Sequence, residues 1–257
     1  MMFLAVDIGN TSTKFGLFKK DAPFEMTFSF PTPQIISGEN IEAELLPRLA
    51  ALGDLNSITI ASVVPKATAI LHDNFGRSRR EAVVRILGHD DIPIINNYQK
   101  PGDVGIDRLI ASYAAWKRWG ADAKQSLIVI GLGTATTFDC INTKGEYLGG
   151  AITLGLGATA EHLHRIAAQL PEVDLVFPKN ILGTTTDESI RSGIMNGTVA
   201  MSEGLTAKLR SEVFPNEEII IVATGGWANL FEERMTFLNH IAPHLVLEGI
   251  ASLTSEK

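Results

Sequence analysis

Residues 7–14, Asp7-Ile8-Gly9-Asn10-Thr11-Ser12-Thr13-Lys14, contain a polar turn between two segments that are typical of β-strands. The apolar run over residues 3–8 predicts a β-strand that ends in a turn, and residues 13–18 predict a second strand. A carboxylate at a strand end, here Asp7, can bind a magnesium ion directly or through water. Gly9 allows the backbone to come close to a phosphate, and the N–H groups and side chains of the turn supply donors. Taken alone, this turn fits a β-hairpin with polar ends equally well.

The same arrangement returns in the second half of the chain. An apolar run over residues 127–130 ends in Gly131-Leu132-Gly133-Thr134, and residues 136–141 predict the next strand. Each half reads as strand, turn with glycine and threonine, strand, turn, strand and then helices. A repeated supersecondary unit predicts two domains of one topology. We place the boundary in the polar stretch 120–126, which gives an N-terminal domain over residues 1–120 and a C-terminal domain over residues 121–257.

Two widespread phosphate-binding motifs are absent from the sequence. It contains no G-x-x-x-x-G-K-[ST], and no G-x-G-x-x-G that opens a helix after a strand. Hydroxyl groups at Thr134, Thr136 and Thr137 can donate to phosphate oxygens, although a run of threonines is also typical of an ordinary strand. Gly225-Gly226 closes a predicted strand over residues 218–223, where the backbone can pass close to an adenosine. Near the end of the chain, residues 245–247 predict a last short strand before a terminal helix.

Composition bounds the class of protein. The chain has 257 residues, 45% of them hydrophobic, and a net charge of −7, so no basic excess is available to neutralise nucleic-acid phosphates. No apolar run approaches the roughly 18 residues that span a bilayer. The single cysteine, Cys140, cannot form a disulfide within the chain. We therefore expect a soluble, cytoplasmic protein that binds neither nucleic acid nor membrane.

Several short motifs, in order, resemble the type III pantothenate kinases, within the superfamily of actin, sugar and acetate kinases and heat-shock chaperones. The resemblance covers essentially the whole chain and rests on these segments: Asp7 to Thr11, Gly105-Ile106-Asp107-Arg108, Gly133-Thr134-Ala135-Thr136-Thr137, Gly149-Gly150-Ala151-Ile152, Leu170-Pro171, Gly183 with Thr186, and Thr224-Gly225-Gly226. It implies an α/β protein with two similar domains of the actin-like ATPase (ribonuclease H-like) fold that face each other across a nucleotide cleft.

The resemblance also implies an activity and a set of site residues. The activity is ATP-dependent phosphorylation of pantothenate to 4′-phosphopantothenate, the first step of coenzyme A biosynthesis, by a homodimer whose pantothenate pocket lies near the subunit interface. Asp107 would be the general base, and Asp7 would hold Mg²⁺. The residues expected to bind ATP are Asp7, Ile8, Gly9, Asn10, Thr11, Ser12, Thr13, Lys14 and Thr134. The residues expected to line the pantothenate pocket are Tyr98, Gly105, Ile106, Asp107, Arg108 and Thr186.

The chemistry of these residue types supports the assignment, with plainer alternatives beside it. Asp107 and Arg108 follow the flexible stretch 101–105 and open a predicted helix over residues 107–119 closed by Gly120, where N–H groups favour anions. A carboxylate there suits a general base, but an N-cap aspartate beside a surface arginine has the same sequence. Lys14 is as compatible with a solvated lysine as with a phosphate contact, and Tyr98 with a half-buried aromatic.

Gly131 is the departure that matters most for function. The family normally has aspartate at this position, and that carboxylate is expected to bind the monovalent cation, potassium or ammonium, that the activity requires. Asp139 lies on the next predicted strand, on the face of Thr137, and offers a replacement oxygen. Leu154 also replaces a usual proline. Two alternatives to the pantothenate kinase remain: a catalytically weak or silent homologue that acts as a ligand-binding or regulatory protein, and a kinase for another small hydroxyl compound.

Overall fold

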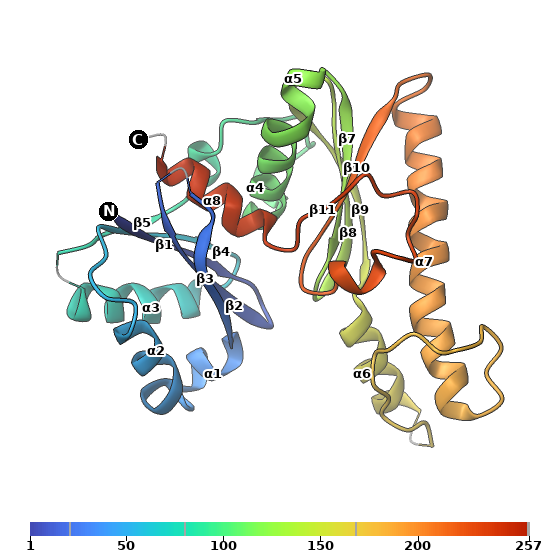
Figure 1. The fold of residues 1–257 in the computed structure, drawn as a ribbon, viewed down its shortest axis with the longest axis horizontal. Helices are drawn as coiled ribbons and strands as arrows, with labels where there is room; N and C mark the ends of the chain where they lie inside the picture. Colours follow the sequence, from blue (N-terminus) through green and yellow to red (C-terminus); the bar gives the residue numbers. More distant parts are fainter. Residues whose placement is uncertain (21, 80, 168, 256–257) are drawn as a thin grey trace. The chain divides into compact units, whose positions relative to one another are not determined.

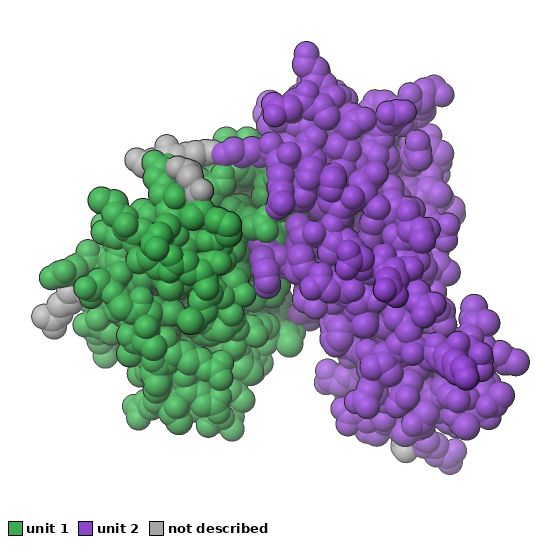
Figure 2. Space-filling view, viewed as in Figure 1, with its two compact units in different colours: residues 1–94, 98–114, 245–257 green, residues 95–97, 115–244 purple. Residues whose placement is uncertain are grey.

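The computed structural model describes residues 1–20, 22–79, 81–167 and 169–255, and they form two compact units. The first unit comprises Met1–Ile94, Tyr98–Ala114 and the segment from Leu245 onward, and the second comprises Ile95–Asn97 and Ala115–His244. Figure 2 colours the first unit green and the second purple. None of the helices in the described ranges combines the length and the apolar character needed to cross a bilayer.

The first unit is built on a five-stranded sheet with the order β3-β2-β1-β4-β5 (Figure 1). β1, β2 and β3 are antiparallel neighbours, whereas β4 runs parallel to β1 and β5 parallel to β4. The strands are β1 (Met2–Ile8), β2 (Ser12–Lys19), β3 (Phe24–Pro31), β4 (Ser57–Ser62) and β5 (Val83–Ile86). The helical elements are α1 (Thr32–Ser37), η1 (Ile41–Leu45), α2 (Leu46–Ala50), α3 (Pro65–Ser78), η2 (His89–Asp91), η3 (Pro101–Asp103), α4 (Ile106–Ala115) and α8 (Leu245–Ser255).

Alternation along the central strands places helices on both faces of this sheet. Ile58 and Ile60 of β4 belong to a buried cluster with Leu71 and Phe75 of α3. Thr59, between these two isoleucines, points to the opposite face, and its hydroxyl is hydrogen-bonded to that of Thr254 of α8 at 2.9 Å. The sheet is therefore buried on two sides, and its strand ends carry the polar turns.

The second unit repeats this topology. Its sheet has the order β11-β10-β7-β8-β9-β6, in which β7, β8 and β9 are antiparallel neighbours and β10 runs parallel to β7. The strands are β6 (Ile95–Asn96), β7 (Ser126–Leu132), β8 (Ala135–Ile141), β9 (Glu146–Leu154), β10 (Ile219–Thr224) and β11 (His240–Ile241). The helical elements are η4 (Trp116–Gly120), α5 (Ala121–Ala123), α6 (Leu156–Ile166), α7 (Thr186–Val213) and η5 (Ala228–Phe231). The predicted repeat of strand, turn and strand is confirmed, since β1-β2-β3 with β4 corresponds to β7-β8-β9 with β10.

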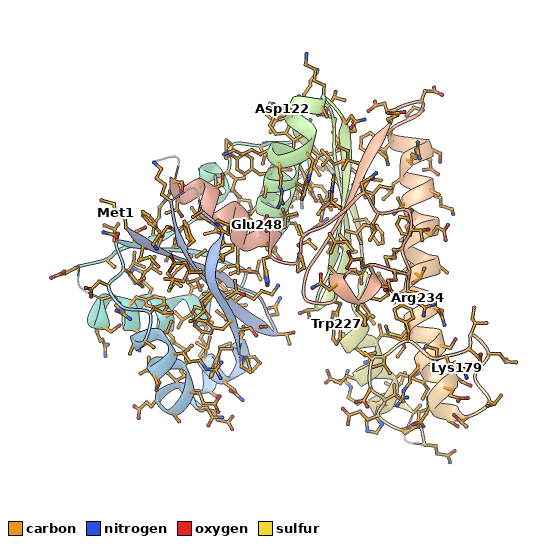
Figure 3. The ribbon with its side chains drawn as sticks, in the orientation of Figure 1. Met1, Asp122, Lys179, Trp227, Arg234 and Glu248 are labelled. Carbon is orange, nitrogen blue, oxygen red and sulfur yellow. The ribbon has the colours of Figure 1, made fainter. Side chains whose placement is uncertain are left out.

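The compact units differ from the predicted domains 1–120 and 121–257 in two places. Residues 115–120 belong to the second unit, and residues from Leu245 onward belong to the first. α4 continues without a break into η4, so Gly120 lies inside a helical stretch that ends at Lys124, where φ is 52°. The predicted strand over residues 245–247 is wrong, because these residues begin α8. α8, marked by Glu248 in Figure 3, groups with the first unit because it contacts β1, β2 and β4.

Candidate active site

The first half of the candidate site centres on Asp7 at the end of β1. The register of the antiparallel pair places Asp7 directly opposite Lys14 of β2, so the two side chains share one face of the sheet. Lys14 Nζ lies 4.0 Å from Asp7 Oδ2. The lysine is therefore paired with a buried carboxylate and is not a freely solvated side chain.

The charge of Asp7 is destabilised by its surroundings. Burial raises the pKa of Asp7 from its ordinary value of 3.8 to about 6, while Lys14 lowers it and the negative charge of Asp107 raises it further. The influence of Asp107 places the two carboxylates in one electrostatic cluster within the first unit. Two carboxylates beside a lysine form a site where a divalent cation relieves repulsion, and Mg²⁺ in phosphoryl-transfer sites is held by one or two carboxylates plus phosphate oxygens.

Asp107 is positioned by the glycine that precedes its helix. It lies in the first turn of α4, and the N–H groups of Arg108 and Leu109 donate to the carbonyl of Gly105 at 3.1 and 3.3 Å. A Cβ on Gly105 would lie 2.5 Å from Asp107 Oδ1, so the carboxylate occupies the space that the missing side chain leaves. His89 donates from Nε2 to the carbonyl of Val104 at 2.8 Å and fixes the loop before Gly105. No local sequence pattern indicates this role of His89.

Not every predicted residue can offer its side chain to a ligand. Ile8 and Thr13 in the predicted phosphate turn are 1% and 0% exposed, so Ile8 offers only backbone groups, and the Thr13 hydroxyl faces Thr32 inside the unit. Ile106 is 5% exposed and packs in the interior, whereas Tyr98 is 38% exposed. The first unit thus brings together Asp7, Lys14 and Asp107, while Thr134 and Thr186 belong to the second unit.

In the second unit, the equivalent turn joins β7 and β8, and two glycines from other segments pack directly against its backbone. A Cβ on Gly155 would lie 2.2 Å from the carbonyl oxygen of Gly133, and one on Gly225 would lie 2.4 Å from the carbonyl oxygen of Leu132. The N–H groups of Gly155 and Trp227 donate to the carbonyls of Thr134 and Leu132 at 3.1 and 3.2 Å. Figure 3 labels Trp227 in the segment that follows β10. Position 225, at the end of β10, therefore needs a glycine, because its φ is 101° and a Cβ there would clash with the backbone of Leu132.

Beside Gly131, a neighbouring hydroxyl group takes up the space of a side chain. A Cβ on Gly131 would lie 2.6 Å from Thr137 Oγ1, so the hydroxyl of Thr137 fills the position of a side chain. That hydroxyl donates to Asp139 Oδ2 at 3.1 Å, and Tyr147 donates to Asp139 Oδ1 at 2.7 Å. Asp139 does share the face of Thr137, as predicted, but both of its oxygens accept hydrogen bonds from hydroxyls. Across the described ranges, no group of three or more His, Cys, Asp or Glu side chains forms a metal cluster.

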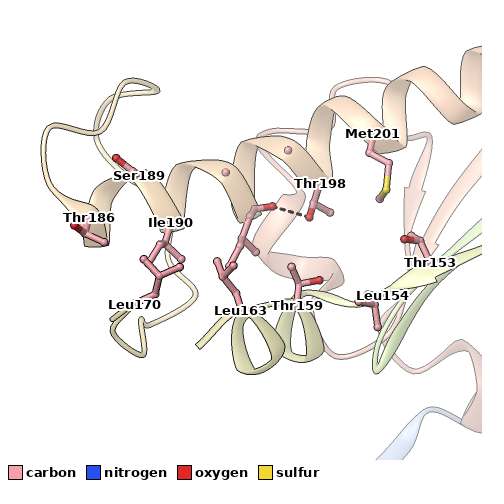
Figure 4. Close-up of a pocket in the computed structure, with 13 residues that line it drawn as sticks. Thr153, Leu154, Thr159, Leu163, Leu170, Thr186, Ser189, Ile190, Thr198 and Met201 are labelled. Carbon is pink, nitrogen blue, oxygen red and sulfur yellow. Dashed lines mark hydrogen bonds between the residues drawn. The ribbon is translucent and has the colours of Figure 1, made fainter. Parts of the chain in front are cut away.

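The second unit also contains a cavity of about 550 Å³ between α6 and α7 (Figure 4). Thr186, predicted to contribute to the pantothenate pocket, is the first residue of α7 and lines this cavity. Its wall is mostly apolar, with Leu154, Leu163 and Ile190 among the lining residues, and the backbone of Gly193 and Gly197 forms part of it.

Solved structures place both units in a known class of fold. The chain is similar to the inorganic polyphosphate/ATP-glucomannokinase of Arthrobacter sp. strain KM, with a TM-score of 0.51 and 16% identity over 100% of this chain and 99% of that one. It is also similar to the ethanolamine utilization protein EutJ of Carboxydothermus hydrogenoformans, with a TM-score of 0.54 and 17% identity over 98% and 89% of the two chains. At these identities the likeness concerns the fold alone, and the fold is that of the actin-like ATPases, as predicted.

Sequence relatives define the family more closely. A profile of the type III pantothenate kinases matches residues 3–208. The type III pantothenate kinase of Anaeromyxobacter dehalogenans strain 2CP-C is 34% identical over 258 residues, 98% of both chains. That of Moorella thermoacetica is 34% identical over 263 residues, 97% of both chains. The chain belongs to the type III pantothenate kinase family, a family of phosphotransferases.

Proposed function

We propose that this protein transfers the γ-phosphoryl group of ATP to the primary hydroxyl of pantothenate, giving ADP and 4′-phosphopantothenate, the first step of coenzyme A biosynthesis. The cluster of Asp7, Lys14 and Asp107 at the end of β1 carries the proposal, because it combines a buried carboxylate, a cation and a second carboxylate in a chain of this family. We also propose a cytoplasmic location, since the single cysteine, Cys140, is buried and unpaired.

Each residue of the cluster has a distinct role in the proposed reaction. Asp107 accepts the proton of the pantothenate hydroxyl as the hydroxyl oxygen forms its bond to the γ-phosphorus and the bond from that phosphorus to the bridging oxygen of ADP breaks. The turn from Gly9 to Thr13 binds phosphate oxygens, and Lys14 adds a positive charge beside them. Mg²⁺ held by Asp7 would neutralise charge on the phosphates.

Replacement of Asp107 by asparagine tests the proposed base. We expect pantothenate-dependent ADP formation by Asp107→Asn to fall at least about a hundredfold, since general base catalysis contributes 10²–10⁴ to a rate. Asp103→Asn is the matched control, because Asp103 is an exposed aspartate of the same loop. Equal turnover by wild type and Asp107→Asn would contradict the role of Asp107.

The surroundings of Gly131 favour one finer proposal about cations. Thr137 fills the place of the absent carboxylate, so we propose that turnover is the same in potassium, ammonium and sodium buffers of equal ionic strength. Gly131→Asp is expected to lower stability without raising turnover, because it displaces Thr137 from its bond to Asp139. Stimulation by potassium in the wild type would instead show that other oxygens form the site.

The glycine at position 131 also supports a second candidate function, that of a ligand-binding or regulatory protein. A binding or regulatory protein of this fold needs no catalytic cation, and Gly131 removes a ligand that the family normally has. This candidate predicts that the purified protein binds ATP or pantothenate without forming ADP under any salt. The retention of Asp7 and Asp107 in one cluster favours the enzyme.

We propose that the protein is a homodimer that associates through the face formed by α6, α7 and the end of β9. Large apolar side chains are exposed on this part of the second unit: Ile152, Leu154, Ile166, Val176, Ile181 and Leu182. Exposed apolar surface of this extent is typical of a protein interface. A second copy packed on the face would also cover the cavity between α6 and α7.

A further inference from the structure

Thr32 is a buried polar residue outside the predicted site. It is the first residue of α1, directly after β3, and it is 0% exposed. Its hydroxyl lies 2.7 Å from the carbonyl oxygen of Gly9 and 2.9 Å from the hydroxyl of Thr13, which is also 0% exposed. Its backbone N–H donates to the carbonyl of Thr11 at 3.0 Å. One residue thus holds three points of a turn that lies about twenty positions earlier in the chain.

The direction of these hydrogen bonds follows from the number of protons. A carbonyl oxygen only accepts, so the single hydroxyl proton of Thr32 is donated to Gly9. The hydroxyl of Thr13 must therefore be the donor in its bond with Thr32. The result is a chain of hydrogen bonds from Thr13 through Thr32 to the Gly9 carbonyl, and every buried hydroxyl in it has a partner.

The orientation of two peptide groups is set by this network. In a trans peptide the C=O of one residue and the N–H of the next point in opposite directions, and the described residues contain no cis peptide bond. The carbonyls of Gly9 and Thr11 both point toward Thr32. The N–H groups of Asn10 and Ser12 must therefore point away from Thr32. Backbone N–H groups that point outward from a turn can contribute to an anion-binding concavity.

We infer that Thr32 is a positioning residue for the phosphate turn, and that it keeps the N–H groups of Asn10 and Ser12 directed at the phosphates of the nucleotide. The inference rests on the proposed function, because it takes residues 9–13 as the ATP phosphate site. Without the Thr32 hydroxyl, the Gly9–Asn10 peptide loses its anchor and is free to turn its carbonyl oxygen toward the phosphates, which repels them. A purely structural role would instead affect stability alone.

The test compares Thr32→Val, which removes the hydroxyl at nearly constant volume, with Thr32→Ser, which keeps it. Thr59→Val is the matched control, because Thr59 is another buried threonine of the first unit, 2% exposed, whose hydroxyl has one partner in Thr254. For each full-length variant we would measure kcat, the KM for ATP and for pantothenate, ATP affinity by calorimetry in the presence of Mg²⁺, and the melting temperature.

We expect Thr32→Val to raise the KM and the Kd for ATP about tenfold, the effect of one lost hydrogen bond, with little change in the KM for pantothenate. Thr32→Ser is expected to have the wild-type KM and Kd for ATP. Thr59→Val is expected to lower the melting temperature without changing the KM or the Kd for ATP. If Thr32→Val does not fold, Thr13→Val tests the same hydrogen-bond network, because the hydroxyl of Thr13 is bonded to that of Thr32. We then expect a smaller rise in the KM and the Kd for ATP.

The inference is overturned if Thr32→Val, or Thr13→Val in its place, changes the melting temperature as Thr59→Val does and leaves ATP affinity unchanged. Failure of the proposed function looks different. In that case the wild type binds ATP without forming ADP, and the calorimetric affinities still decide the role of Thr32. A wild type that binds no ATP overturns both proposals.

Discussion

At the residue scale, the ionised form of Asp7 is destabilising for the folded chain. Its folded pKa of about 6 lies above the ordinary 3.8, so between pH 4 and pH 6 the folded state binds more protons than the unfolded state. Stability from this residue is present below pH 4 and is lost as the pH rises through 6. The difference between the two pKa values corresponds to about 3 kcal/mol.

Asp7→Asn should therefore become more stable than the wild type as the pH rises. We expect the difference in free energy of unfolding to grow by up to about 3 kcal/mol between pH 4 and pH 7, while kinase activity is lost. Urea unfolding of both proteins across this range measures it. Parallel stability curves for wild type and variant would show that Asp7 titrates normally in the folded chain.

Gly105→Ala tests the close approach of Asp107 to the backbone. The new Cβ would lie 2.5 Å from Asp107 Oδ1, so the carboxylate must move. We expect kcat to fall roughly a hundredfold, because a displacement of about 1 Å in a reacting group costs that much. Gly102→Ala is the control, since nothing lies within 4 Å of a Cβ there. Equal activity of the two variants would contradict the proposed placement of the base.

Local sequence patterns predicted the polar turn that contains Asp7 and Lys14, but neither the pairing of these two side chains nor the residues that hold the site. A polar turn between two strands is visible in eight consecutive residues, and the strand register places Lys14 opposite Asp7. Thr32 and His89 act on the turn and on the Asp107 loop through hydrogen bonds across the fold. Neither position has a local pattern that indicates its partner.

At the element scale, α7 carries glycines on the face that we propose to be covered by a second copy. A Cβ on Gly193 or Gly197 meets nothing within 4 Å, so within one chain both positions have room for a side chain. Gly76 of α3 has equally open surroundings and serves as the reference. Helix propensity alone predicts that replacing any of them stabilises the monomer by up to about 1 kcal/mol.

Gly197→Leu should distinguish the effect of a side chain on the stability of α7 from its effect on dimer formation. We expect the side chain to raise the dimer dissociation constant at least about tenfold by overpacking the interface, whereas Gly76→Leu leaves it unchanged. Sedimentation equilibrium measures both. If the wild type is a monomer at all concentrations, the proposed dimer is wrong.

The misassigned element shows where periodicity fails. Residues 245–247 are a short apolar run, and so short a run fits a strand and a buried helix equally well. In the structure Leu245, Leu247, Ile250 and Leu253 are all buried, which is the wider apolar surface of a packed helix. The choice between strand and helix was decided by the β-sheet against which this segment packs.

At the scale of the whole molecule, the repeat could be read from the sequence but the division of the chain could not. The two halves have matching turns, and their sheets share one strand arrangement. The boundary was predicted from polar composition over residues 120–126, yet α8 returns to the first unit. Such a return depends on contacts between segments far apart in the chain, and composition carries no record of them.

A chain that ends at His244 tests this division. Loss of α8 removes four buried leucine and isoleucine side chains from the first unit, each worth about 2 kcal/mol, and together about as much as the stability of a typical domain. We expect hydrogen exchange to become fast in β1 and β4, while β7 and β10 stay protected. Retained protection in β1 would mean that the first unit is stable without α8.

In the proposed reaction, the primary hydroxyl of pantothenate is the acceptor of the γ-phosphoryl group. The most direct measurement follows ADP formation by the wild-type protein with Mg²⁺ and ATP across a panel of pantothenate and other small hydroxyl compounds, with the phosphorylated product identified by mass spectrometry. We expect rapid turnover with pantothenate and a product that carries one phosphate on its primary hydroxyl. Faster turnover of another compound, or ATP binding without any turnover, would contradict it.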